Sequence, residues 1–298
     1  FLKALSASTL SMSLAAPIRA NTSKHKHWAW THARADETPA QIAAKFRELH
    51  QAGISAALIG GATSEVCRFA REEGLDPRAT LVSGYHQGPV PGVGDPGPAQ
   101  AALFLGMHAA SGSRGFLAHT LTSRIRELRV NGRRVCELEL FAAALAPHGI
   151  RPLFFSGSPA ACSQARNRLP GILTHGIEKN GGPAALDAVR WRDELAAAAV
   201  GSLTRPNLPP PYAPQGPFHA AVTFRDGHRA AARHAEPWGF RHHRATVQID
   251  TETFADLYRQ LVRLCYLPPL AERTLPLSLF LFNLRGRLGL AWARRRLP

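Results

Sequence analysis

Two histidines and one glutamate in the middle of the chain carry the clearest chemical signal in the sequence. His108 follows the apolar run at 103–106, His119 lies eleven residues later among small and hydroxyl residues, and Glu137 opens a segment with apolar residues at helical spacing. Neutral imidazoles and carboxylates that converge from separate segments are ligands that zinc prefers. These residues therefore predict a metal site, and the alternative is that they are ordinary members of a chain with 14 histidines.

The elements expected around these residues place them at strand and helix ends. Residues 101–106 and 150–157 are apolar runs typical of buried strands. His108 then follows the end of a strand, where ligands of α/β proteins gather. The pair Asn131-Gly132 predicts a tight hairpin turn. A helix should follow it, with the Glu137 carboxylate in the first turn, near the positive end of the helix dipole.

The order of these elements indicates the fold class. Before residue 78, apolar spacing predicts a helix ending near Gly53, a short strand at 55–61 and a helix at 64–73. Alternating helices and strands predict an α/β fold, a three-layer sandwich with a mostly parallel sheet and a smaller C-terminal α+β portion. A proline-rich segment at 203–217 separates the two portions.

Four segments are expected along the chain. They are a signal segment at 1–20, an α/β domain with an atypical N-terminal part at 21–202, a smaller α+β portion at 203–270, and an apolar and basic tail at 271–298. The first of these has a lysine, a weakly apolar stretch and a small-residue exit, and its opening resembles the residues after the paired arginines of a twin-arginine signal. Export to the periplasm is expected if it acts as a signal, and a cytoplasmic location if it is an ordinary helix.

Composition narrows the set of partners. The formal net charge is +15, but the arginines are scattered and accompany no finger spacing, aromatic RNA-binding strand or long internal basic run, so specific nucleic-acid binding is not expected. The four cysteines form no CxxC pair, which favours buried free thiols.

The tail is expected to fray or to pack on the body or a partner subunit, and the alternative is that it lies on a membrane.

Four motifs in a fixed order resemble the dipeptide-operon type of D-aminopeptidase, a zinc metallopeptidase family. They are the GxHA turn in "LGMHAA", the loop "HTLTS", the hairpin-to-helix element "NGRRVCE" and the strand ending in "FFSG". The resemblance covers residues 78–268. Each motif alone is short, and the order and spacing of all four make the match specific.

The resemblance implies a function and a role for each candidate residue. Members of that family bind two zinc ions side by side, act on short peptides with N-terminal D-amino acids, and assemble as ring-shaped homo-oligomers. By position, His108 and Glu137 match two ligands of one zinc. His119 matches a histidine beside the metals that is not a ligand and that acts on the substrate or on proton transfer.

The N-terminal ligand motifs of that family are not found in this sequence. The sequence contains no DxEG strand and no NDxHG-like turn. Gly60, Gly61 and Ala62 occupy the position where that turn is expected. Because a zinc site needs three or four protein ligands, other residues would have to complete it, and the candidates are Asp36, Glu37, His32 and His86. Fewer than two zinc ions per chain are therefore expected, one or none.

Three functions stay open on the sequence. The first is a zinc-dependent D-aminopeptidase with an altered N-terminal half. The second is a catalytically inactive or single-metal homologue that serves as a peptide-binding protein or an oligomeric scaffold. The third is an unrelated exported hydrolase that shares only the fold.

Overall fold

The computed structural model describes residues 87–91, 93–178 and 187–296. The expected signal segment, the helices and strand expected before residue 78, and the candidate ligands Asp36, Glu37, His32 and His86 lie outside the described residues. The four-segment division and the export of the chain therefore stay predictions. Residues 87–178 and 189–275 fall within one compact unit, and α12 (Leu275–Arg296) belongs almost wholly to another.

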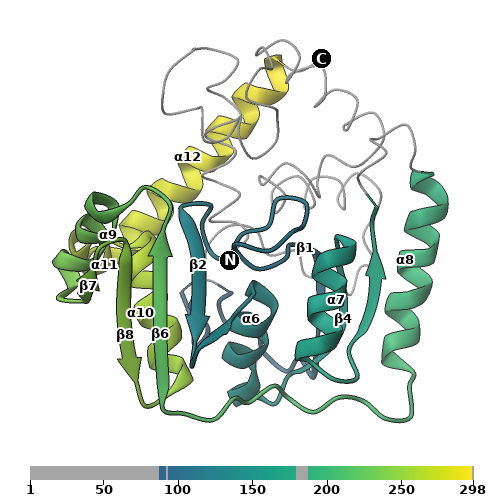
Figure 1. The fold of residues 1–298 in the computed structure, drawn as a ribbon. Coiled ribbons are helices and arrows are strands. Elements are labelled where there is room, and N and C mark those ends of the chain that lie inside the picture. The colour runs from purple at the N-terminus through teal and green to yellow at the C-terminus, as the bar shows by residue number, and fades with distance from the viewer. Residues whose placement is uncertain (1–86, 92, 179–186, 297–298) are drawn as a thin grey trace. The chain divides into compact units, whose positions relative to one another are not determined.

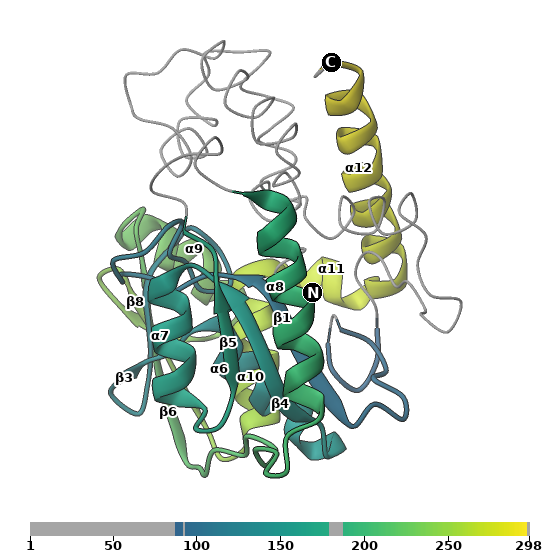
Figure 2. The same ribbon diagram turned by 90° about the vertical axis from the view of Figure 1, so that its right-hand side faces the viewer.

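A three-stranded parallel sheet holds the strands that the sequence predicts. It consists of β1 (Ala101–Met107), β4 (Arg151–Gly157) and β5 (Leu173–Gly176), in the order β1-β4-β5. Every residue of β4 after Arg151 is buried, as a central strand covered on both faces requires. Figure 2 shows this sheet beside helices α7 and α8.

Helices follow the central hairpin, β4 and β5. After the hairpin comes α6 (Glu137–Leu145), continued by η1 (Ala146–His148). The helix α7 (Pro159–Arg168) is capped by Ser158, whose hydroxyl accepts the Ala161 N–H at 3.4 Å, and proline takes the first position. The helix α8 (Ala188–Leu203) is fixed to β5 by Trp191, whose indole N–H donates to the Gly176 carbonyl at 2.9 Å.

A second, antiparallel sheet has five strands. These are β2 (Ile125–Val130), β3 (Arg133–Arg134), β6 (Phe218–Phe224), β7 (Arg241–His243) and β8 (Thr246–Thr251), in the order β3-β2-β6-β8-β7. The predicted turn joins β2 to β3, with Asn131 at φ 49° and Gly132 at φ 77°. Positive φ at both positions defines the turn that suits a twisted hairpin. Figure 1 shows β2, β6 and β8 side by side.

Two helices of the second half, α9 (His228–Ala235) and α10 (Phe254–Tyr266), pack on this sheet. The short segments η3 (Glu236–Trp238) and α11 (Pro269–Arg273) follow α9 and α10, respectively. The amphipathic helix α10 contacts β6, β8 and also α6. Its residues Leu257 and Leu261 are fully buried. This helix therefore links the C-terminal half of the unit to the helix that carries Glu137.

These elements confirm the α/β class and add one feature to it. The central hairpin does not extend the parallel sheet. Instead β2 pairs with β6 from the C-terminal half, with Leu128 opposite Val222. Consequently the α+β portion includes residues from the middle of the chain, because backbone pairing joins strands that lie far apart in the sequence.

The tail forms α11 and α12, and the α12 side chains of Leu277, Phe280, Leu281 and Leu288 are exposed. Among the described residues, no helix has the length and apolar character needed to cross a bilayer. Cys136, Cys162 and Cys265 are free thiols, as expected, and Cys67 lies outside the described residues.

Candidate active site

The three residues singled out in the sequence lie together in the structure. His108 follows β1, His119 lies in the loop before β2, and Glu137 is the first residue of α6. The His108 and His119 rings are 4.8 Å apart between centroids, and His119 Nε2 is 3.8 Å from Glu137 Oε1. Their exposed fractions are 9%, 7% and 0%. Two imidazoles and a carboxylate therefore share a nearly dry site.

Backbone carbonyls set the orientation of both imidazole rings. The carbonyl of Leu117 lies 2.7 Å from His119 Nδ1, and that of Phe116 lies 3.3 Å from His108 Nδ1. Because a carbonyl only accepts, each Nδ1 carries a hydrogen and donates it. In the neutral form of each ring the lone pair is then on Nε2, the arrangement that metal-binding and proton-accepting histidines use.

The Glu137 carboxylate is only half satisfied. Its Oε1 accepts the Leu121 N–H at 3.0 Å, whereas its Oε2 is buried without a hydrogen-bond partner. The His119 Nε2 atom, which lies near it, is also buried and without a hydrogen-bond partner. Buried polar atoms of this kind are costly unless a cation or a proton meets them. The donor set therefore fits a cation or a proton shared within the site.

A small network of hydroxyl groups fixes the loop that carries His119. Ser111 and Thr120 exchange hydrogen bonds, since each backbone N–H donates to the other's hydroxyl, at 3.0 and 2.8 Å. The Thr120 hydroxyl also donates to the Val135 carbonyl at 3.1 Å. The His119 N–H donates to the Ala109 carbonyl at 3.0 Å. The loop is thereby tied to the segment after β1 and to the start of α6.

Two tyrosines of α10 complete the surroundings of Glu137. The Tyr266 hydroxyl donates to the Leu121 carbonyl, and the Tyr258 hydroxyl donates to the Pro91 carbonyl at 3.1 Å. Burial, with a smaller contribution from the Glu137 charge, raises the pKa of Tyr258. The phenol therefore stays neutral and keeps the hydrogen that it donates to the Pro91 carbonyl.

Sequence reasoning missed the residues that hold Glu137 in place. Leu121 has φ 64°, and Tyr266 lies 145 positions along the chain from it. A left-handed leucine has no sequence signal, because leucine rarely adopts that conformation. The contact with Tyr266 depends on the docking of α10 against α6. Neither feature follows from local pattern.

The described residues by themselves do not complete a metal site. Within residues 87–178 and 187–296, no group of three or more His, Cys, Asp or Glu side chains is arranged to hold a metal ion. His108 and Glu137 supply two donors of the type that zinc uses, and a stable site needs three or four. The remaining donors would have to come from outside the described residues, where Asp36, Glu37, His32 and His86 lie.

One known protein family matches most of the chain. The family model described as D-aminopeptidase matches residues 19–262. The chain belongs to the D-aminopeptidase family. This match includes His108, His119, Glu137 and Tyr258, and it confirms the family that the four sequence motifs predict. Membership of the D-aminopeptidase family supports a peptidase function.

Two relatives show how far the likeness to the D-aminopeptidases extends. A D-aminopeptidase of Bacillus subtilis (strain 168) is 28% identical over 134 residues, which are 44% of this chain and 48% of the relative. The chain thus matches about half the length of that curated relative. The solved structure of DppA from Bacillus subtilis is 20% identical, with a TM-score of 0.57 over 80% of this chain and 90% of that one. Its title describes a zinc-dependent, self-compartmentalizing protease. This structural likeness shows a shared fold.

Proposed function

We propose that this chain is a zinc-dependent aminopeptidase that removes N-terminal D-amino acids from short peptides. The observation that carries the proposal is that two adjacent residues of the site, Glu137 and His119, each bury an atom without a hydrogen-bond partner (Oε2 and Nε2), with His108 beside them. A structural cluster would pair such atoms with each other or with neighbours. A site that accepts a cation and moves a proton leaves them available.

The position of each residue in the site indicates its proposed role. His108 and Glu137 would hold the metal. When bound, zinc lowers the pKa of a water to about 7 and polarises a peptide carbonyl. His119, with its hydrogen on Nδ1 facing the Leu117 carbonyl, presents Nε2 to the site. That nitrogen can accept a proton and then deliver it to the leaving amine, a role typical of histidine.

Assembly into a homo-oligomer is part of the proposal. The DppA protein is described as a self-compartmentalizing protease, which supports assembly of subunits around its active sites. We propose the same arrangement here, with fewer than two zinc ions per chain because the acidic ligand pair is missing from the sequence.

The test uses the full chain, with metal content and hydrolysis measured separately. Purified protein is analysed for zinc by mass spectrometry of the metal, then incubated with D-alanyl-D-alanine and with L-alanyl-L-alanine, with and without added zinc. The expected result is zinc-dependent release of D-alanine and little release of L-alanine. Bound zinc without hydrolysis of either dipeptide would favour an inactive scaffold, and two tightly bound zinc ions would contradict the predicted stoichiometry.

A further inference from the structure

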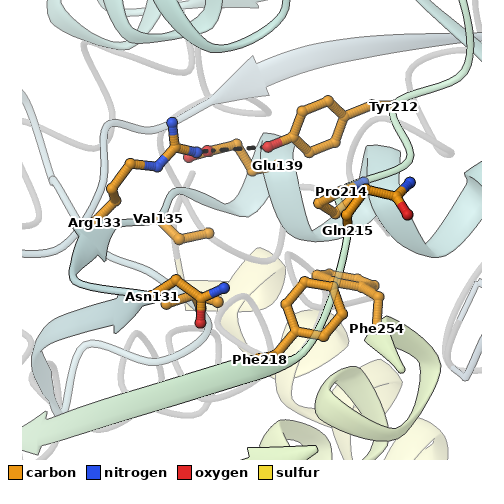
Figure 3. Close-up of a pocket in the computed structure, with 10 residues that line it drawn as sticks. Asn131, Arg133, Val135, Glu139, Tyr212, Pro214, Gln215, Phe218 and Phe254 are labelled. Carbon is orange, nitrogen blue, oxygen red and sulfur yellow. Dashed lines mark hydrogen bonds and ion pairs between the residues drawn. The ribbon is translucent and has the colours of Figure 1, made fainter. Parts of the chain in front are cut away.

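A pocket of about 210 Å³ lies beside α6, on the side that Glu139 faces. The hairpin, the segment before β6 and the start of α10 line it (Figure 3). Glu139 faces this pocket, whereas Glu137 faces His119. Two positions along a helix turn the side chain by about 200°. The pocket is therefore separate from the candidate active site, and the proposed hydrolysis does not use it.

One end of the pocket is polar and carries an excess of positive charge. The Glu139 side chain is 3% exposed, and its Oε1 lies 3.6 Å from Arg133 Nη2 and 3.9 Å from Arg168 Nε. The Tyr212 hydroxyl donates to the same oxygen at 3.4 Å, and Oε2 accepts the Cys136 N–H at 3.1 Å. Two guanidinium groups thus share one carboxylate, which leaves one positive charge unneutralised.

Arg133 can offer that charge to a ligand. Its side chain is 60% exposed although it lines the pocket. A guanidinium has five N–H donors in a rigid fork that matches a carboxylate, and the contacts of Arg133 with Glu139 and Tyr212 use only part of it. A second carboxylate can therefore bind here without unpairing Glu139.

The opposite end of the pocket is apolar and aromatic. The Phe218 and Phe254 rings meet edge to face, 5.7 Å apart between centroids. Pro214 and Val135 add to the apolar lining. Figure 3 shows the two phenylalanines across the pocket from Arg133 and Tyr212. Since a cavity of about 150 Å³ takes up benzene, this pocket has room for one ring or branched side chain together with a carboxylate.

We propose that this pocket binds a small apolar carboxylate, with the carboxylate on Arg133 and the apolar group against Phe218 and Phe254. The chemistry is that of an apolar residue with a free carboxyl group, either the C-terminal end of a peptide or a single N-acylated amino acid. The site needs no metal, and binding to it is independent of the candidate active site.

The test measures binding to the full chain after treatment with a chelator. N-acetyl-phenylalanine and its amide are titrated by calorimetry, because the amide keeps the ring and removes the charge. A charge-assisted pair contributes about 1.5–3 kcal/mol, so the acid should bind about tenfold or more tightly than the amide. N-acetyl-alanyl-phenylalanine, tested alongside, distinguishes a peptide end from a single residue; tighter or equal binding of the peptide assigns the pocket to peptide ends.

Two arginine variants on the same hairpin test whether Arg133 is the residue that binds the carboxylate. Arg133→Gln should lose the preference for the acid over the amide. Arg129→Gln should keep it, because Arg129 is similarly exposed, at 46%, but pairs with Glu127 and does not line the pocket. Phe254→Ala should weaken binding of both ligands alike, which tests the apolar end separately.

Several outcomes would overturn the proposal. Equal affinity for the acid and the amide, or an unchanged preference in Arg133→Gln, would show that Arg133 holds no carboxylate. No binding of either ligand to the wild-type chain would also overturn it. Zinc content and dipeptide hydrolysis are measured in separate assays, so failure here is distinguishable from failure of the peptidase proposal.

Discussion

Glu137 Oε1 accepts the backbone N–H of Leu121 at 3.0 Å, and Leu121 holds the left-handed φ of 64° that this contact requires. The carbonyl of the same leucine accepts the Tyr266 hydroxyl. One strained residue thus joins the carboxylate of α6 to the last residue of α10. A non-glycine residue in this conformation costs on the order of 1 kcal/mol, and the two hydrogen bonds offset that cost.

The first prediction concerns the half-satisfied carboxylate. Glu137→Gln keeps an acceptor for Leu121 and removes a buried charge, so the free energy of unfolding of the metal-free chain should change by less than about 1 kcal/mol. Zinc binding should fall strongly, because a neutral amide is a poor ligand. Urea unfolding and metal analysis measure the two effects.

The neighbouring glutamate of α6 gives the matched control. Glu139→Gln changes an equally buried carboxylate that faces away from His119, so zinc content should stay at the wild-type level. Equal zinc content in the Glu137→Gln chain would remove Glu137 from the metal site.

The second prediction separates metal binding from proton transfer. His119→Ala should lower hydrolysis of D-alanyl peptides by about 10²–10⁴-fold, the range for loss of a general acid or base, and leave zinc content nearly unchanged. His148→Ala, at an exposed position in η1, should leave both unchanged. If His119→Ala loses its zinc, the residue is a ligand, and if it keeps full activity, it has no part in the reaction.

The third prediction concerns the close approach of β1 and β4. A Cβ atom at Gly157 would lie 2.3 Å from the Met107 carbonyl oxygen, so Gly157→Ala should destabilise the chain by about 1–3 kcal/mol through overpacking. Because Met107 precedes His108, zinc affinity should fall as well. Thermal unfolding and metal titration check both effects.

A second glycine tests whether this effect is local. Gly201 lies within α8, with nothing within 4 Å of an added Cβ. Gly201→Ala should therefore be neutral or should stabilise the chain by up to about 1 kcal/mol, the helical preference of alanine over glycine. If Gly157→Ala and Gly201→Ala destabilise the chain equally, the close approach of β4 to Met107 is not the cause of the destabilisation.

The fourth prediction is a pH dependence from His234. Burial, and then the Arg124 charge, lower the pKa of His234 below its usual value of 6.5, and its ring stacks on Phe224 at 5.1 Å. Between the two pKa values the unfolded chain binds more protons than the folded one, so stability falls as pH drops below about 7. The loss levels off once pH is below the folded pKa.

Replacing this histidine isolates its contribution. His234→Gln should show a smaller loss of unfolding free energy between pH 7 and 5 than the wild-type chain. His243→Gln, which removes an exposed histidine of β7, should keep the wild-type loss. If the wild-type and His234→Gln chains lose the same unfolding free energy between pH 7 and 5, His234 is not the origin of the pH dependence.

Local features of the fold were predictable because short-range rules govern them. The Asn131-Gly132 turn needs positive φ at two residues that tolerate it, and Ser158-Pro159 starts a helix by satisfying an end N–H. The apolar run at 151–157 forms β4 because it can be buried on both faces. Each outcome depends on residues a few positions apart.

The sequence by itself determined the residue types of the site, the strands and helices that carry them, and the family. Only the tertiary structure decided that His108, His119 and Glu137 meet, that the central hairpin pairs with β6, and that Leu121 and Tyr266 hold the carboxylate. The physical reason is the range of the interactions. Turns and caps are satisfied by neighbours in the chain, whereas sheet pairing and the contacts of buried charges are settled between distant segments, once the elements pack.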